Sequence, residues 1–559
     1  MTSSKRKAKV YPSSSNGDRS APRRLLVEAV GHFRAGRLEA AEARARAIPD
    51  GAPEAADALH LRGVIARQRR RPNDAVALLT RAIAINPDLA LAHFNLGNAL
   101  YDLGRRDEAG HAYARAAALA PDVAPVQSSH GSMLRATGDT DAAVAAFARA
   151  IAADPGYAPA HNGLGNARRD QGRIEDAVAA FEQAIAIEPD YAEALLNLAA
   201  ALLDRDETGA ALARIERAIA LRPDLAPAHV NLGYARLDAG DVAAAARAFD
   251  DALALAPDLA EAHVGLGRIA YDRGRPDDAI AHFRRAIASR ADFARPHAGI
   301  ALAALAKGDA VVALDACDAC LAVDPGNRYA IALKAVALGE AGEREDARAL
   351  VDFDRLIARR RIATPPGFAS LAAFNAALAD AALNHPSLAH EPHDKATRNG
   401  RQTRELFIDP EGALAALRAE IETAVDAYLA AHPADPDHPW LAHPPRRWRL
   451  TAWATVLGSQ GHQAAHIHPS GWLSGVYYVA LPPVMSDASE ESDHRAGWIV
   501  FGDPGAEAAH AATPETRLYR PEEGCMFLFP SYVYHHTLPF AAAEPRISIA
   551  FDVLPLDAV

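Results

Sequence analysis

A period of 34 residues governs most of this chain. Proline followed by Asp or Gly recurs at intervals of 34 residues, at Pro87, Pro121, Pro155, Pro189, Pro223, Pro257 and Pro325. Ala291 is the one position of this series without a proline. A small residue recurs in a second phase, at Gly63, Gly97, Gly131, Gly165, Ala199, Gly233, Gly267, Ala301 and Ala335. One unit of fixed length therefore repeats along the chain, and at 559 residues a single compact core is excluded.

The copy spanning residues 87–121 explains why the unit repeats. Apolar residues fall at helical spacing over 92–103 and again over 107–119. Gly104 lies between the two segments and suits the left-handed conformation at a helix end, and Pro121 stops the second segment. Each copy is therefore predicted to be a helical hairpin. Its apolar stripe can be covered only by a neighbouring copy, so the hairpins must stack.

This pattern resembles the tetratricopeptide repeat family. It covers about residues 57–358 in roughly nine copies, after a degenerate pair at 23–56, so we expect a solenoid over residues 23–358. The resemblance implies an all-α, right-handed superhelix. The concave groove of such a superhelix, lined by the first helix of each hairpin, holds a protein or peptide partner.

Three asparagines share one phase on the first helices and are candidate ligands for a peptide in that groove: Asn95, Asn197 and Asn231. Gly163 and Gly265 occupy the same phase and interrupt the series. A solvated polar face is the alternative interpretation.

Several histidines and cysteines in the repeats have a structural explanation. Five histidines share one phase, which predicts a recurrent helix position and not a metal cluster: His93, His161, His229, His263 and His297. Cys317 and Cys320 form a C-x-x-C motif, but they stand where Phe283 and Ala286 stand one repeat earlier. We therefore expect both thiols to pack in the solenoid and not to bind metal or form a redox pair.

Charge and composition exclude further classes. The net charge is −12 and local basic residues gather in the first 24, so nucleic acid is not the expected partner. Residues 1–22 lack a continuous apolar stretch, which predicts a disordered basic tail and not a secretion signal. No uncharged apolar run of about 18 residues occurs, so no membrane span is expected. Only 3 cysteines are present, and we expect a cytoplasmic protein.

The chain changes character in its last third. All five tryptophans lie there, at Trp440, Trp448, Trp453, Trp472 and Trp498. Amphipathic helices are predicted at 368–383 and 411–432, so residues 359–445 are assigned as a helical support or linker region. Residues 446–559 hold short strand-like runs separated by turn signals, which favours a small barrel or jelly-roll domain.

Polar residues at alternate positions mark the candidate site in this domain. His466 and His468 would point to the same face of an extended segment, and His535 could complete a three-ligand metal site. Arg546 and Ser548 have the same spacing on a later strand. An inward arginine with a hydroxyl is suited to binding a carboxylate.

Four segments together resemble the small bacterial and phage-type branch of the 2-oxoglutarate and Fe(II) dependent oxygenases. They are, in order, HIHPSGWLSGVYYV, GWIVFGDP, PEEGCMFLFPSYVYH and RISIAF, and the upstream ATRNGRQTREL extends the resemblance over residues 366–555. The resemblance implies a double-stranded β-helix, a jelly-roll or cupin-like fold, that uses Fe(II), 2-oxoglutarate and O2. It implies that His466 and His535 bind iron and that Arg546 and Ser548 bind the distal carboxylate of 2-oxoglutarate.

The third iron ligand departs from the superfamily. Its usual second ligand is Asp or Glu two residues after the first histidine, where this chain has His468. Three neutral imidazoles leave Fe(II) with one more positive charge than a site with a carboxylate. Asp503 is an alternative carboxylate, and solvated histidines that cap a strand are another interpretation. His535 is favoured over His536 because ten residues separate it from Arg546, the spacing usual in the superfamily.

Three functional hypotheses follow. The first is a 2-oxoglutarate- and Fe(II)-dependent dioxygenase, a hydroxylase, with a solenoid that recruits a protein or peptide. The second is an interaction scaffold whose barrel has lost turnover, and the third is a three-histidine dioxygenase that does not use 2-oxoglutarate. Trp472, Tyr477 and Tyr478 are candidate walls of the catalytic pocket, with core packing as the alternative.

Overall fold

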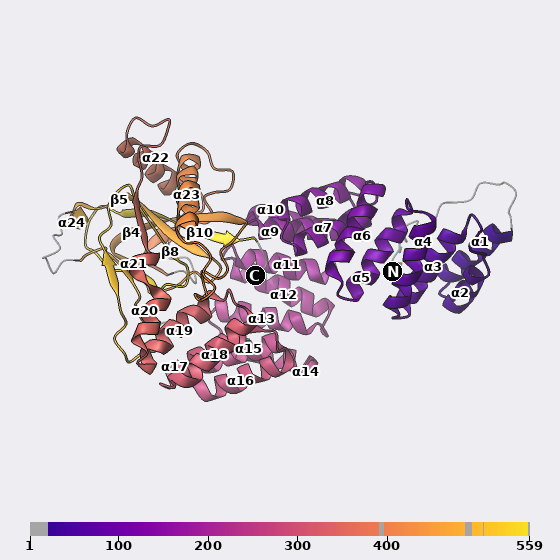
Figure 1. The fold of residues 1–559 in the computed structure, drawn as a ribbon, viewed down its shortest axis with the longest axis horizontal. Coiled ribbons are helices and arrows are strands. Elements are labelled where there is room, and N and C mark those ends of the chain that lie inside the picture. Colours follow the sequence, from indigo (N-terminus) through magenta and orange to yellow (C-terminus); the bar gives the residue numbers. More distant parts are fainter. Residues whose placement is uncertain (1–20, 391–395, 487–494, 507, 557–559) are drawn as a thin grey trace. The chain divides into compact units, whose positions relative to one another are not determined.

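The structure is a computed structural model that describes residues 21–390, 396–486, 495–506 and 508–556 (Figure 1). The chain divides into two compact units, Met1–Ala167 and Arg168–Val559. The predicted basic tail falls almost wholly on residues 1–20, which lie outside the described part, and the first helix begins at Ala21. No helix among the described residues is long and apolar enough to cross a membrane.

The first unit is a stack of helical hairpins. Its helices are α1 (Ala21–Arg34), α2 (Leu38–Arg46), α3 (Ala55–Gln68), α4 (Pro72–Ile85), α5 (Ala90–Asp102), α6 (Arg106–Leu119), α7 (Ala124–Ala136), α8 (Thr140–Ala153) and most of α9 (Ala158–Asp170). The predicted turn glycine of each hairpin has a positive φ, as at Gly104 with 74°. Arg70 takes the same slot with a φ of 56°, so the geometry of the turn is kept where glycine is missing.

The second unit begins with further hairpins. Its helices are α10 (Ile174–Ile187), α11 (Ala192–Leu203), α12 (Thr208–Leu221), α13 (Ala226–Asp238), α14 (Val242–Leu255), α15 (Ala260–Asp272), α16 (Pro276–Ser289), α17 (Ala294–Ala306), α18 (Ala310–Val323), α19 (Arg328–Ala341), α20 (Arg344–Val351) and α21 (Phe353–Leu356). Cys317 and Cys320 are fully buried on α18, as expected for packing residues. The solenoid prediction is confirmed.

The recurrent histidines serve the repeat. Nε2 of His93 donates to the carbonyl oxygen of Pro87 at 2.9 Å, and the same bond recurs two and four periods later, at His161 and His229. Each histidine thereby ties a first helix to the proline turn before it.

Two antiparallel sheets form the jelly-roll domain. The larger has the order β1-β8-β5-β10-β4-β3-β2 and the smaller has the order β7-β6-β9. The strands are β1 (Ala358–Arg361), β2 (Ala389–His390), β3 (Thr397–Gln402), β4 (Trp448–Gln463), β5 (Leu473–Ala480), β6 (Ile499–Phe501), β7 (Arg517–Tyr519), β8 (Cys525–Pro530), β9 (His535–Thr537) and β10 (Arg546–Pro555), with a short α24 (Pro483–Ser486).

The region 359–445 holds more than the expected helices. It contains α22 (Leu371–Leu383) and α23 (Gly412–Ala431), which lie beside the larger sheet in Figure 1. It also supplies the edge strands β2 and β3, and β1 begins at Ala358 and pairs with β8. A purely helical support is therefore a wrong description of this region. The sheet starts where the solenoid was expected to end.

Candidate metal centre

The chain brings three predicted histidines together. His466 follows β4 and exchanges two backbone hydrogen bonds of 3.1 Å with His535 at the start of β9. His468 comes two residues later, and its ring centroid lies 5.0 Å from those of both other histidines. One nitrogen from each imidazole lies within 4.8 Å of the others. We call these residues the three-histidine cluster.

The hydrogen bonds of the cluster leave one nitrogen of each ring available. Nδ1 of His466 bonds to the carbonyl oxygen of Ala464 at 2.8 Å, and Nδ1 of His535 bonds to that of Val533 at 3.1 Å. Nδ1 of His468 lies 2.6 Å from a carboxylate oxygen of Asp552. Since every Nδ1 has an acceptor, three Nε2 lone pairs are free for a metal ion. This donor set fits a divalent transition metal.

Burial favours the neutral, metal-binding form of two histidines of the cluster, His466 and His535. It lowers the pKa of His466 to about 3, with a further contribution from His468. Burial also holds the pKa of His535 well below its usual value, and the neighbouring imidazoles add to the effect. A set of solvated strand-capping side chains would not show these shifts.

Two alternative ligands lie elsewhere. His536 follows His535 on β9 and so points to the other side of the strand. Asp503 exerts its charge on His536, and its Oδ1 accepts from the amide of Gly505 at 2.8 Å. Among the described residues, neither belongs to the group of side chains that could hold one ion.

Arg546 is a buried cation that takes part in none of the ion pairs of the described residues. It is 1% exposed at the start of β10, donates to the carbonyl oxygen of Gly497 at 3.2 Å and lies 3.5 Å from the hydroxyl of Tyr478. Its Nε has no partner in the described structure, and burial lowers its pKa. A buried guanidinium with a free donor is suited to an anionic ligand.

The neighbours of Arg546 define a small polar site. Ser548 is 3% exposed and lies on the same face of β10 by strand alternation. Opposite it on β4 is Thr455, whose buried hydroxyl has no hydrogen-bond partner among the described residues. Thr455 is a candidate that the sequence did not reveal, because only the strand register brings it beside Ser548.

The three aromatic residues that were candidate pocket walls have different surroundings. Tyr478 adjoins Arg546, whose guanidinium carbon lies 5.1 Å from the centre of its ring. Trp472 stacks on Trp440 at 4.3 Å, and the hydroxyl of Tyr477 donates to Asn375 of α22 at 2.6 Å. Trp472 and Tyr477 are therefore core residues, which was the alternative interpretation.

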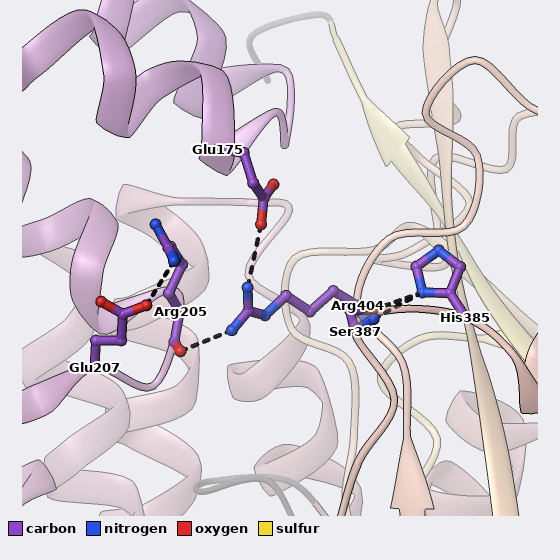
Figure 2. Close-up of polar contacts among 6 residues, drawn as sticks. All are labelled: Glu175, Arg205, Glu207, His385, Ser387 and Arg404. Atoms are coloured by element: carbon purple, nitrogen blue, oxygen red, sulfur yellow. Dashed lines mark hydrogen bonds and ion pairs between the residues drawn. The ribbon is translucent and has the colours of Figure 1, made fainter.

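The three-histidine cluster opens into a cleft of about 1510 Å³. His466, His468 and Asp552 line one wall, and the hairpin turns and helices of α10 to α13 line the other. Arg404 and Glu175 of α10 both line this cleft, and Figure 2 shows that Arg404 donates to Glu175 at 3.2 Å and to the carbonyl oxygen of Arg205 at 2.7 Å. The solenoid is thus part of the surroundings of the candidate metal site.

The groove asparagines lie on first helices, α5, α11 and α13. Nδ2 of Asn95 donates to the carbonyl oxygen of Leu91 at 2.9 Å and lies 2.8 Å from Nε2 of His60. The amide nitrogen of Asn95 therefore has one partner within α5 and a second in α3 of the preceding hairpin. Its side-chain oxygen is the atom left for a ligand.

Comparisons with known proteins match both parts of the chain. Residues 451–552 match the family described as "Putative 2OG-Fe(II) oxygenase", and tetratricopeptide repeat models match segments between residues 67 and 328. No curated protein matches the chain.

Several solved structures are similar to part of the chain. They include the APC/C hetero-tetramer Cut9-Hcn1, with 20% identity, 55% of this chain, 60% of that chain and a TM-score of 0.39. The chain therefore spans less than two thirds of that protein. MamA has 28% identity, 30% of this chain, 96% of that chain and a TM-score of 0.26. PilW, described as a type IV pilus biogenesis factor, has 20% identity, 38% of this chain, 100% of that chain and a TM-score of 0.36.

Proposed function

Because this chain joins tetratricopeptide repeats to a domain of the 2OG-Fe(II) oxygenase family, we propose that it is an Fe(II)- and 2-oxoglutarate-dependent oxygenase. The observation that carries the proposal is the buried, unpaired donor of Arg546. Burying an unpartnered donor costs free energy, and a carboxylate ligand would satisfy this one in a side chain that is only 1% exposed.

The roles of the residues follow from their chemistry. His466, His468 and His535 would hold Fe(II) through Nε2, while Arg546 and Ser548 would bind the distal carboxylate of 2-oxoglutarate. Iron and 2-oxoglutarate together supply the activation of O2 when bound. The protein would orient the co-substrate through the guanidinium, and burial lowers the pKa of His466 and His535, which favours the neutral, metal-binding form of these two imidazoles.

We propose a protein or peptide as the substrate, bound by the solenoid. The support is the cleft, in which turns of the repeats face His466 and His468. A polypeptide held against α10 to α13 would be presented to the metal without any further movement of the solenoid.

The test is an anaerobic titration of the metal-stripped chain with Fe(II) and then 2-oxoglutarate. We expect the visible charge-transfer band of the iron chelate in the native protein. In Arg546→Ala the affinity for 2-oxoglutarate should fall by at least tenfold, because a charge-assisted pair is worth more than about 1.5 kcal/mol. Arg359→Ala, at an arginine on the exposed face of β1, is the matched control and should leave the titration unchanged.

Each other outcome favours one of the remaining hypotheses. Iron binding without the band would support a three-histidine dioxygenase that does not use 2-oxoglutarate. Absence of iron binding would contradict the enzyme proposal and support an interaction scaffold.

A further inference from the structure

The three-histidine cluster has no carboxylate ligand, but the carboxylate of Asp552 contacts one of its histidines, His468. We propose that Asp552 is a positioning residue that supplies negative charge through His468, in place of a carboxylate bound directly to the metal. The inference rests on the proposed function, because it assumes that the cluster holds a divalent metal ion.

The contacts of Asp552 converge on His468. One oxygen, Oδ1, lies 2.6 Å from Nδ1 of His468, and the two side chains are each 10% exposed. The hydroxyl of Ser474 donates to the same oxygen at 2.6 Å and lies 2.9 Å from the hydroxyl of Ser531. Among the ion pairs of the described residues, Asp552 has no Lys or Arg partner, so its charge is directed to the imidazole.

The other two histidines provide an internal comparison. His466 and His535 each use Nδ1 on a backbone carbonyl oxygen, which carries no net charge. Only His468, at the position where the superfamily places a carboxylate, is bonded to an anion. The histidine that replaces the usual carboxylate ligand is therefore the one that contacts a carboxylate, that of Asp552.

The physical effect follows from this geometry. An imidazole that donates its Nδ1 hydrogen to a carboxylate has a fixed tautomer and a more basic Nε2. That stronger donor stabilises a divalent ion, and the nearby negative charge stabilises a trivalent one even more. Asp552 also lies on the face of β10 that carries Arg546 and Ser548, since residues two apart point to the same side.

The experiment compares Co(II) affinity, by chelator competition without 2-oxoglutarate or O2, in the native chain and in Asp552→Asn. We expect the affinity to fall 10- to 100-fold, as is typical when a carboxylate behind a histidine ligand is lost. The Fe(III)/Fe(II) reduction potential should rise, because the negative charge that favours Fe(III) is gone. Asp437→Asn removes an exposed carboxylate outside the candidate ligand group and is the control that should leave the affinity unchanged.

A second pair of variants, made in the His468→Asp chain, distinguishes an electrostatic role of Asp552 from a structural one. In His468→Asp a carboxylate can bind the metal directly, so adding Asp552→Asn should no longer lower the affinity. Equal loss in both backgrounds would assign Asp552 a structural role and overturn the inference. So would native affinity and potential in Asp552→Asn alone. If the native chain binds neither Co(II) nor Fe(II), both the proposed function and this inference fail, whereas native binding without a difference in Asp552→Asn refutes only the inference.

Discussion

Alanine at Gly299 should destabilise the helix that holds it, because the aromatic ring of Phe283 occupies the space that the new Cβ would need. The ring belongs to α16 and lies between glycines of two first helices, Gly267 of α15 and Gly299 of α17. A Cβ added at Gly299 would lie 2.6 Å from Cζ and 2.7 Å from Cε2 of this ring. Non-bonded carbons prefer about 3.5–4.0 Å, and Phe283 is only 5% exposed, so the ring cannot swing into solvent.

The magnitude comes from two opposing terms. Overpacking a close-packed core costs about 1–3 kcal/mol, whereas replacing glycine by alanine inside a helix gains about 1 kcal/mol. We therefore expect Gly299→Ala to lower the local free energy of unfolding by about 1 kcal/mol. Gly339→Ala in α19 is the matched control, because its Cβ would have no neighbour within 4 Å. The difference between the two variants isolates the steric term.

The assay is native-state hydrogen exchange of α16 and α17 amides, since repeat arrays open locally. Each variant is also measured with Phe283→Leu, which removes the ring that causes the overlap. Gly299→Ala should then cost less than in the native background. If Gly299→Ala stabilises the chain as much as Gly339→Ala does, the steric reasoning is refuted.

Two further predictions concern buried titratable groups. Burial lowers the pKa of His60 to about 4 in the folded chain, so the unfolded chain binds a proton at His60 more readily. The free energy of unfolding therefore falls as the pH drops below 6.5. Hydrogen-exchange protection of the α3 amides should fall by about 2 kcal/mol between pH 7 and pH 5. His60→Gln, which cannot titrate, should lose most of that dependence, and its persistence would disprove the assignment. Burial raises the pKa of Cys317 and Cys320 to about 12, so neither thiol should be alkylated at pH 8 in the folded chain, whereas both should react in urea. Labelling at the same rate in both states would contradict this.

The repeats were predictable because their constraints are local. The period, the turn glycines and the proline stops each act within one hairpin, so the sequence displays them directly. The structure adds the reason why Gly163 and Gly265 interrupt the asparagine series. Each faces an aromatic ring sixteen residues earlier, Phe147 or Phe249, which leaves no room for a Cβ. The interruption therefore reflects packing.

The candidate site was predictable where alternation along one strand was sufficient. Arg546 and Ser548 are such a pair on β10, whereas His466 and His468 keep the same two-residue spacing in the segment that follows β4. The partners of these residues depend on strand register and could not be predicted, which holds for Asp552 behind His468. Strand β1 was missed for a similar reason. Its sequence, ARRR, looks polar, and only pairing with β8 makes it an edge strand.

The end of the solenoid and the barrel share one core. Ile331 and Leu338 of α19 belong to the same buried cluster as Phe374 and Trp472. The hydroxyl of Tyr532 donates to the carbonyl oxygen of Leu350 at 2.6 Å. A barrel joined by a flexible linker would have neither feature, and its solenoid would act only by raising the local concentration of a partner. In this chain the last repeats are part of the barrel's support, so under the proposed function a polypeptide held against α10 to α13 would keep a fixed position relative to the three-histidine cluster. That arrangement would favour selection of one residue of the polypeptide by geometry over selection by proximity alone.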